Sequence, residues 1–222
     1  MIFQAYSDRA ALMAGLSGVI AEELSQALRT GPATLSVPGG TTPGPVFDAL
    51  SDVDLAWSRV SVLLTDERWV GEDSPRSNTR LLRERLLRGK AASAHLLPLY
   101  APSPQPEDRL DQLAQAIAPH LPITVLLLGM GNDMHTASLF PGADHLPQAL
   151  APDAPLLMAL RADAAGEPRL TLSARVLQSA RHIHILITGS DKRQALDRAL
   201  TLPPLLAPIC TVLDQATVHW AE

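Results

Sequence analysis

Three things are scarce in this sequence: cysteine, lysine and long apolar runs. Cys210 is the single cysteine among 222 residues, so the chain can form no internal disulfide, which fits a reducing compartment. Its neighbours are apolar, and a small core residue is expected there rather than a nucleophile. The longest apolar segment, residues 123–130, is much too short to span a bilayer, and residues 1–10 lack the basic start of a secretory signal. We therefore expect a cytoplasmic protein with no membrane partner.

Charged residues are also fewer than usual. Asp, Glu, Lys and Arg make up 18% of the chain, below the usual value of about 25%, which suggests that much of it is buried. The 18 basic and 23 acidic side chains give a net charge of −5, and this acidity argues against a nucleic-acid partner, which calls for a basic face. It does not exclude an anionic small ligand, because a pocket can differ in sign from the whole surface. Only two of the basic residues, Lys90 and Lys192, are lysines.

Helical and strand patterns alternate along the chain. Apolar spacing and capping residues predict helices over residues 8–29, 43–50, 79–88, 107–118 and 190–200. Apolar runs predict strands over residues 33–37, 60–64, 96–100, 123–128, 156–160 and 182–188, with an edge strand over 218–220. The expected helix N-caps are Thr42, Ser77 or Asn78, and Ser190.

Strands that alternate with helices are typical of an α/β fold with a mostly parallel sheet and helices on both faces. The continuous apolar run over 123–128 suits the centre of such a sheet. The sequence has no repeat, and its proline-rich stretches resemble loops rather than linkers. We therefore expect one domain over residues 1–222, with a ligand site beyond the carboxyl ends of the strands.

The loop PGGTTP follows the strand expected over 33–37. Gly39 and Gly40 let backbone N–H groups approach an anion, while Thr41 and Thr42 add hydroxyls and the next helix adds its positive end. This pattern predicts a phosphate cradle. A tight turn with a threonine cap is the alternative, and the loop alone favours that alternative.

The segment TDERWV follows the next strand, over 60–64. In an extended segment Asp66 and Arg68 point the same way, so one carboxylate and one guanidinium can face a polar substrate together. The alternative is a solvated ion pair of little energetic weight.

The loop GMGNDMHTASLFPG follows the most apolar strand, over 123–128. His135 is the natural general base near neutral pH, and Asp133, two residues before it, is placed to orient or tune it. The other histidines are interpreted as structural. His182 and His184 alternate on a strand, but no cysteine or carboxylate at a suitable spacing completes a metal site, so we expect none.

Two cations follow later strands. Arg169 lies in the segment PRLTLS, and Lys192 falls in the first turn of a helix, where a cation opposes the helix dipole. An anion bound nearby would offset that cost, which favours a binding role for Lys192. A solvated surface lysine is the alternative.

Together these segments resemble the 6-phosphogluconolactonase family. The matching pieces are VPGGTTP, LLTDERWV with SNTRLL, LLLGMGNDMHTASLFPG, PRLTLS and LITGSDKRQAL, in the family's order over roughly residues 37–196. The resemblance implies a Rossmann-like fold related to the sugar-phosphate isomerases and deaminases. It also implies a hydrolase without cofactor or metal, acting on 6-phospho-D-glucono-1,5-lactone in the oxidative pentose phosphate pathway.

The resemblance also implies roles for particular residues. His135 is expected to act as general base on water, with Asp133 beside it, and Asp66 and Arg68 are expected to line the sugar end. The phosphate is expected to lie among Gly39, Gly40, Thr41, Thr42, Arg169 and Lys192.

Met134 departs from the family pattern, because many relatives have glycine there. A methionine disfavours positive φ, so we expect this loop to follow a different backbone path. Two other functions stay open: an amino-sugar-phosphate deaminase or isomerase, and a sugar-phosphate-binding regulatory module that lacks catalysis. The sequence leaves the oligomeric state open between a monomer and a weak dimer.

Overall fold

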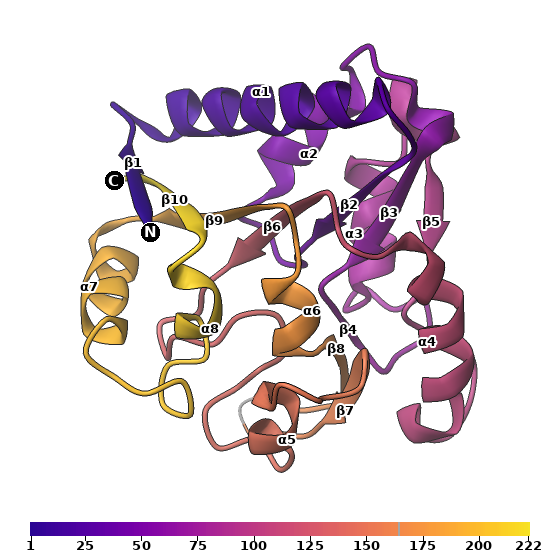
Figure 1. Ribbon diagram of the computed structural model, residues 1–222, viewed down its shortest axis with the longest axis vertical. Helices are drawn as coiled ribbons and strands as arrows, with labels where there is room; N and C mark the ends of the chain where they lie inside the picture. Colours follow the sequence, from indigo (N-terminus) through magenta and orange to yellow (C-terminus); the bar gives the residue numbers. More distant parts are fainter. Residues whose placement is uncertain (164) are drawn as a thin grey trace.

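The computed structural model describes residues 1–163 and 165–222, and its centre is a parallel sheet of seven strands (Figure 1). The order across the sheet is β1-β10-β9-β6-β2-β3-β5, and every neighbouring pair runs parallel. The strands are β1 (Ile2–Ala5), β2 (Ala33–Val37), β3 (Val60–Leu64), β5 (His95–Leu97), β6 (Val125–Gly129), β9 (His182–Thr188) and β10 (Ala216–Ala221). The expected α/β class with a mostly parallel sheet is confirmed.

Helices cover both faces of this sheet. The long helix α1 (Arg9–Leu28) and α2 (Gly44–Ser51) lie on one face, and α6, α7 and α8 lie on the other (Figure 1). The remaining helices are α3 (Asn78–Arg85), α4 (Leu110–Ile117), α5 (Leu146–Leu150), α6 (Ala174–Gln178), α7 (Ser190–Ala199) and α8 (Cys210–Leu213). Short 3₁₀ helices span Trp57–Arg59, Gly89–Ser93, Pro106–Arg109 and Ala118–His120. None of the helices in the described residues is long and apolar enough to cross a membrane.

A second, smaller sheet is antiparallel and has the order β4-β8-β7. Its strands are β4 (Asp66–Arg68), β7 (Leu157–Leu160) and β8 (Arg169–Leu172). We expected 156–160 to join a mostly parallel sheet and predicted no strand over 66–68 or 169–172, so this part of the prediction was wrong. The strands have only three or four residues each, too few to show a period.

Other expected boundaries need correction. Ser77 caps α3 as expected, since its side chain accepts a hydrogen bond from the Arg80 N–H. Thr42 caps nothing, because α2 begins at Gly44 after Pro43, without a side-chain cap. Ser190 is the first helical residue of α7 rather than its cap, and its backbone N–H donates to the carboxylate of Glu222 at 3.3 Å.

The segment 218–220 belongs to β10, but β10 is not at the edge of the sheet. It lies between β9 and the unexpected strand β1, which is the true edge. Because β1 is a short and mostly exposed strand, its sequence carries no apolar alternation.

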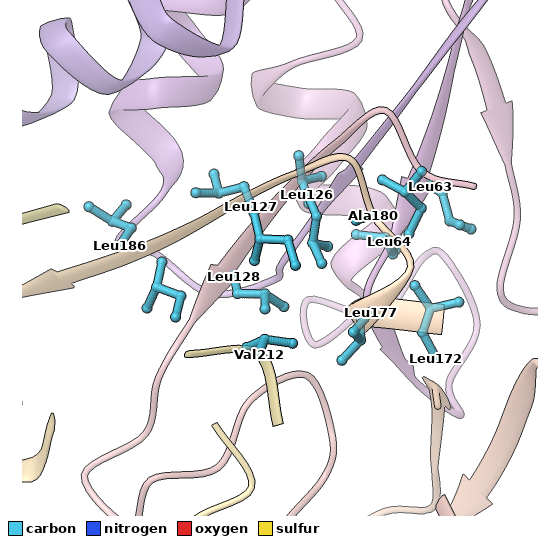
Figure 2. Packing of buried hydrophobic residues seen from close by; sticks show 14 of the residues in the cluster. Leu63, Leu64, Leu126, Leu127, Leu128, Leu172, Leu177, Ala180, Leu186 and Val212 are labelled. Atoms are coloured by element: carbon cyan, nitrogen blue, oxygen red, sulfur yellow. The ribbon is translucent and has the colours of Figure 1, made fainter. Parts of the chain in front are cut away.

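The apolar core on one face lies between the sheet and the helices α6 and α8. Figure 2 shows Leu126 and Leu128 of β6 near Leu177 of α6 and Val212 of α8. The Leu126, Leu128, Leu177 and Val212 side chains are fully buried. Such continuous burial on both faces explains why β6 reads as an unbroken apolar run. Cys210 is half-buried nearby, and its thiol donates to the Ala199 carbonyl.

Candidate functional site

A cavity of about 400 Å³ opens beyond the carboxyl ends of β2, β6 and β9. This is where a parallel sheet presents its ligand site. The small sheet completes its wall with residues of β4 and β8, so both sheets contribute to one cavity. Nine of the residues expected from the sequence to form the site are placed as follows: Gly39, Gly40, Thr42, Asp66, Arg68, His135, Arg169 and Lys192 line the cavity, and Asp133 contacts His135.

His135 and Asp133 form the most direct polar pair at the cavity. Nδ1 of His135 lies 2.6 Å from Oδ1 of Asp133, and the same oxygen accepts from the His135 backbone N–H at 3.3 Å. Burial raises the pKa of Asp133, but its bond to His135 and the charge of that ring outweigh this and hold the pKa below its usual value. A carboxylate at Nδ1 favours the tautomer that carries the proton there, which leaves Nε2 as the basic nitrogen.

Gly131 makes room for this pair. A Cβ at Gly131 would lie 2.2 Å from Oδ1 of Asp133 and 2.2 Å from Nδ1 of His135, far inside van der Waals contact. The Gly131 N–H also donates to the His135 carbonyl at 2.9 Å, which closes the loop on itself. The loop therefore requires glycine at this position for space rather than for an unusual φ.

Met134 takes a conformation that a methionine disfavours. Its φ is 66°, in the left-handed region that glycine prefers, and Ala137 follows at 49°. Neighbours hold this conformation: the Met134 N–H donates to the Gly131 carbonyl, and the Ile209 N–H donates to the Met134 carbonyl. The strain is of the order of 1–2 kcal/mol for a side chain in this region.

Asp66 and Arg68 are neighbours on one face of β4, as expected for an extended segment. Both carboxylate oxygens of Asp66 accept hydroxyl bonds, from Ser138 at 2.6 Å and from Thr65 at 2.9 Å. Ser138 is fully buried and committed to this bond, so it is not a nucleophile facing the cavity. Arg68 donates from Nη1 to the Arg76 carbonyl, and its buried Nε has no partner among the described residues.

Arg169 lies directly opposite Arg68 on the neighbouring strand β8. Burial and the charge of Arg68 lower the pKa of the Arg169 guanidinium. Its Nη2 donates to the Ala165 carbonyl, while its buried Nε has no partner in the described part of the chain. Like charges directly opposite each other on paired strands are destabilising. The charges of Asp66 and Glu167 oppose part of this effect, and Oε1 of Glu167 lies 3.8 Å from Nη2 of Arg169.

Phe140 links two parts of the site that the sequence did not connect. Its ring centroid lies 4.2 Å from that of His135, and the Arg169 guanidinium carbon lies 5.9 Å from the Phe140 centroid. The aromatic ring therefore lies close to both the proposed base and the cation. Phe140 was visible in the motif LFPG, but nothing in the pattern indicated this contact.

Lys192 is not a solvated surface lysine. Its Nζ donates to the Met130 carbonyl at 2.7 Å and lines the cavity. Burial lowers its pKa, and the charge of Asp133 partly opposes this effect. A partly desolvated ammonium with one protein acceptor can donate its other protons to an anionic ligand.

The glycine loop serves two purposes. A Cβ at Gly39 would lie 2.0 Å from Oδ1 of Asn78, so this glycine admits the Asn78 side chain, which also lines the cavity. Gly40 has a φ of 86°, and the backbone N–H groups of residues 39–42 have no acceptor among the described residues. Thr41 is exposed and does not line the cavity. The sequence predicted Asn78 only as a possible helix cap, and the residues around it did not indicate that it would line the cavity.

The other histidines lie outside the cavity. Four polar side chains form a partly buried chain with the two histidines at its centre: the Tyr6 hydroxyl contacts Nδ1 of His219 at 2.8 Å, Nε2 of His219 contacts Nδ1 of His184 at 3.0 Å, and Nε2 of His184 contacts Glu23 at 2.8 Å. Glu23 of α1 also reaches His182 at 3.2 Å. In the part of the chain that the structure describes, no group of three or more His, Cys, Asp or Glu side chains is arranged to hold a metal ion.

Comparisons with known proteins identify the family to which the chain belongs. The model of the family described as glucosamine-6-phosphate isomerases/6-phosphogluconolactonase matches residues 7–220. A 6-phosphogluconolactonase of Mesorhizobium japonicum is 42% identical over 99% of this chain and 94% of its own length. One of Rhizobium meliloti is 40% identical over 97% of each chain. A crystal structure of a 6-phosphogluconolactonase from Shewanella baltica superposes with a TM-score of 0.96 at 35% identity, covering 100% of this chain and 98% of the other. The chain therefore belongs to the glucosamine-6-phosphate isomerase/6-phosphogluconolactonase family.

Proposed function

We propose that this protein hydrolyses 6-phospho-D-glucono-1,5-lactone to 6-phospho-D-gluconate in the oxidative pentose phosphate pathway. The observation that carries the proposal is the pairing of His135 with Asp133 at a cavity that Arg68, Arg169 and Lys192 also line. Hydrolysis of a phosphorylated lactone needs both parts: a base for water and cations for the phosphate. The names of the relatives support the same activity.

In the proposed reaction, Nε2 of His135 takes a proton from water as the water oxygen attacks the lactone carbonyl carbon. The new C–O bond turns the carbonyl oxygen into an oxyanion. Collapse of this intermediate breaks the bond to the ring oxygen, which receives the proton that His135 held. Asp133 stabilises the imidazolium through the bond it already accepts from Nδ1. A general base contributes about 10²–10⁴-fold to such a reaction.

The phosphate lies, in this proposal, between the glycine loop, Arg169 and Lys192. The free N–H groups of residues 39–42 donate to phosphate oxygens, and the two cations add charge-assisted bonds. Thr42 adds its hydroxyl from the cavity wall, and Thr41 contributes its backbone N–H rather than its side chain. Binding at this remote end orients the lactone over His135.

The sugar end lies, in this proposal, against β4. The Arg68 guanidinium, which lines the cavity, stabilises the oxyanion. Asp66 accepts a sugar hydroxyl while Thr65 and Ser138 hold its carboxylate in place.

The test is a lactonase assay on freshly generated 6-phosphogluconolactone, with the spontaneous rate subtracted. Wild type is compared with His135→Ala and Asp133→Asn. We expect both variants to fold, to bind 6-phosphogluconate, and to lose about 10²–10⁴-fold in kcat. Near wild-type turnover in His135→Ala would contradict the role of His135 as general base.

The same preparations separate the alternatives. Ammonia released from glucosamine 6-phosphate would identify a deaminase. Thermal stabilisation by sugar phosphates with no turnover of either substrate would identify a binding module.

We further propose that residues 1–222 act as one domain in the cytoplasm, as a monomer or weak dimer. The family match over residues 7–220 supports a single domain, and the single cysteine supports a reducing compartment. Sedimentation across a concentration series measures the oligomeric state.

A further inference from the structure

Glu67 is a buried carboxylate between the two cavity residues of β4. Its side chain has no exposed surface, whereas Asp66 and Arg68 on either side line the cavity. Because side chains alternate along a strand, Glu67 points to the back of β4, away from the proposed substrate. Among the described residues no Lys, Arg or His forms an ion pair with Glu67.

Five hydrogen bonds satisfy this carboxylate. Oε1 accepts from the backbone N–H groups of Arg68 and Asn78, each at 2.8 Å. Oε2 accepts from the Thr79 N–H at 2.7 Å, the Thr79 hydroxyl at 2.8 Å and the Ser77 hydroxyl at 3.2 Å. Four of these donors belong to the start of α3, where the positive end of the helix favours a negative charge.

The bonds tie β4 to α3 at the edge that has no neighbouring strand. β4 has three residues and pairs only with β8, so a side chain holds its second edge where a strand would otherwise lie. Asn78, the first residue of α3, donates to the Asp66 carbonyl at 3.0 Å and strengthens the same junction.

Arg68 depends on this anchor more than Asp66 does. Thr65 and Ser138 hold the Asp66 carboxylate independently. The Arg68 backbone N–H donates to Glu67 itself, and within residues 1–163 and 165–222 its guanidinium makes one hydrogen bond, to the Arg76 carbonyl. We propose that Glu67 is a positioning residue that aims Arg68 at the reacting end of the substrate. This inference rests on the proposed lactonase function.

A double-mutant cycle on the full chain tests the proposal, with kcat and KM for the phosphorylated lactone as readouts. The variants are E67Q, R68Q and the pair, and E84Q on the exposed side of α3 is the matched control. In E67Q an NH₂ group replaces one carboxylate oxygen. This group is a donor, and it lies opposite another donor such as the Thr79 N–H. We expect kcat of E67Q to fall at least about tenfold, more than KM changes, because a small misplacement of a reacting group is costly.

The R68Q background separates positioning from general stability. There we expect E67Q to lower kcat further by less than about threefold, since no guanidinium remains to be aimed. E84Q should match wild type. The inference is overturned if E67Q lowers kcat by the same factor in the R68Q background as in wild type. It is also overturned if E67Q folds and keeps wild-type kcat.

Thr79→Val covers the case in which E67Q does not fold. It removes one hydroxyl donor and keeps the Thr79 N–H bond, so we expect a fall in kcat of about two- to fivefold that vanishes in the R68Q background. Wild-type kcat in Thr79→Val overturns the inference. A wild type without lactonase activity overturns the proposed function and this inference with it, whereas an active wild type with an unaffected E67Q overturns the inference alone.

Discussion

Arg68 and Arg169 lie directly opposite each other on β4 and β8, and both line the same cavity. Like charges paired across strands repel, and burial lowers the pKa of Arg169 further. The charges of Asp66 and Glu167 oppose part of this repulsion. We expect a bound phosphate to oppose more of it, so that binding of the ligand raises stability.

The two lysines of the chain allow a controlled test of the phosphate site. In Lys192→Met we expect KM for the phosphorylated lactone to rise by about 10–100-fold with a smaller change in kcat, because a charge-assisted bond is lost. Inorganic phosphate should raise the Tm of wild type more than that of the variant. Lys90→Met, at an exposed position, should behave as wild type. An equal rise in KM on a lactone without phosphate would contradict the role of Lys192.

Substrate affinity should also weaken at alkaline pH. Burial lowers the pKa of Lys192, so the ammonium loses its proton at a lower pH than an exposed lysine does. The neutral amine binds phosphate less well, and KM should therefore rise as the pH climbs through that lowered pKa. A pH series of KM checks this, and Lys192→Met should show a flatter profile. A rise of the same size in the variant would assign the effect to another group.

Gly131→Ala should separate catalysis from folding. The added methyl would lie 2.2 Å from Nδ1 of His135, so the ring and Asp133 must move. A displacement of this kind can lower kcat by about 100-fold. Gly18→Ala, in α1 where a methyl meets nothing within 4 Å, serves as a control and should keep full activity. Wild-type kcat in Gly131→Ala would mean that the loop tolerates the displacement.

Met134 permits a direct measure of the strain in this loop. We expect Met134→Gly to be more stable than Met134→Ala by about 1 kcal/mol, because only the alanine keeps a Cβ at positive φ. The same two substitutions at Met13, inside α1, should rank the other way by about 1 kcal/mol, since glycine is a poor helix former. Denaturant unfolding of the four variants gives both differences. Alanine as the more stable residue at both positions would rule out strain at Met134.

The partly buried chain from Tyr6 to Glu23 should make stability fall in acid. Burial, with the charge of His184, lowers the pKa of His219 to about 4. An unfolded histidine has a pKa of about 6.5. Between this pH and the lowered pKa of His219, the unfolded state binds more protons than the folded state, so the free energy of unfolding declines as the pH falls. The full loss for one such group is of the order of 3 kcal/mol. His219→Gln should flatten the decline between pH 7 and 4 in denaturant unfolding, and an unchanged slope would assign the effect elsewhere.

The sequence predicted the parts of this molecule in which local pattern and tertiary role coincide. The run Leu126–Leu128 reads as a central strand because both of its faces are buried. His135 and Asp133 read as a pair because two residues of sequence bring them into contact. Such features need no knowledge of distant neighbours.

The sequence did not predict features that depend on contacts between residues far apart in the chain. Glu67 meets α3 through residues ten to twelve positions later, and Phe140 meets Arg169 through the second sheet. Met134 takes a conformation that its side chain disfavours, because its N–H donates to the Gly131 carbonyl and its carbonyl accepts from the Ile209 N–H. Tertiary contacts overrode local preference in each case.

The position of β1 also bears on how the chain acquires its structure. Ile2 pairs with Thr217, and Ala5 pairs with Trp220, so β1 has no partner strand until β10 exists. During synthesis from the ribosome, residues 2–5 must wait while nearly the whole sheet assembles. Closing so large a loop is slow. The pairing of β1 with β10 is therefore expected to be a late event, and a chain released before β10 would leave β9 as an open edge able to recruit a strand from another molecule.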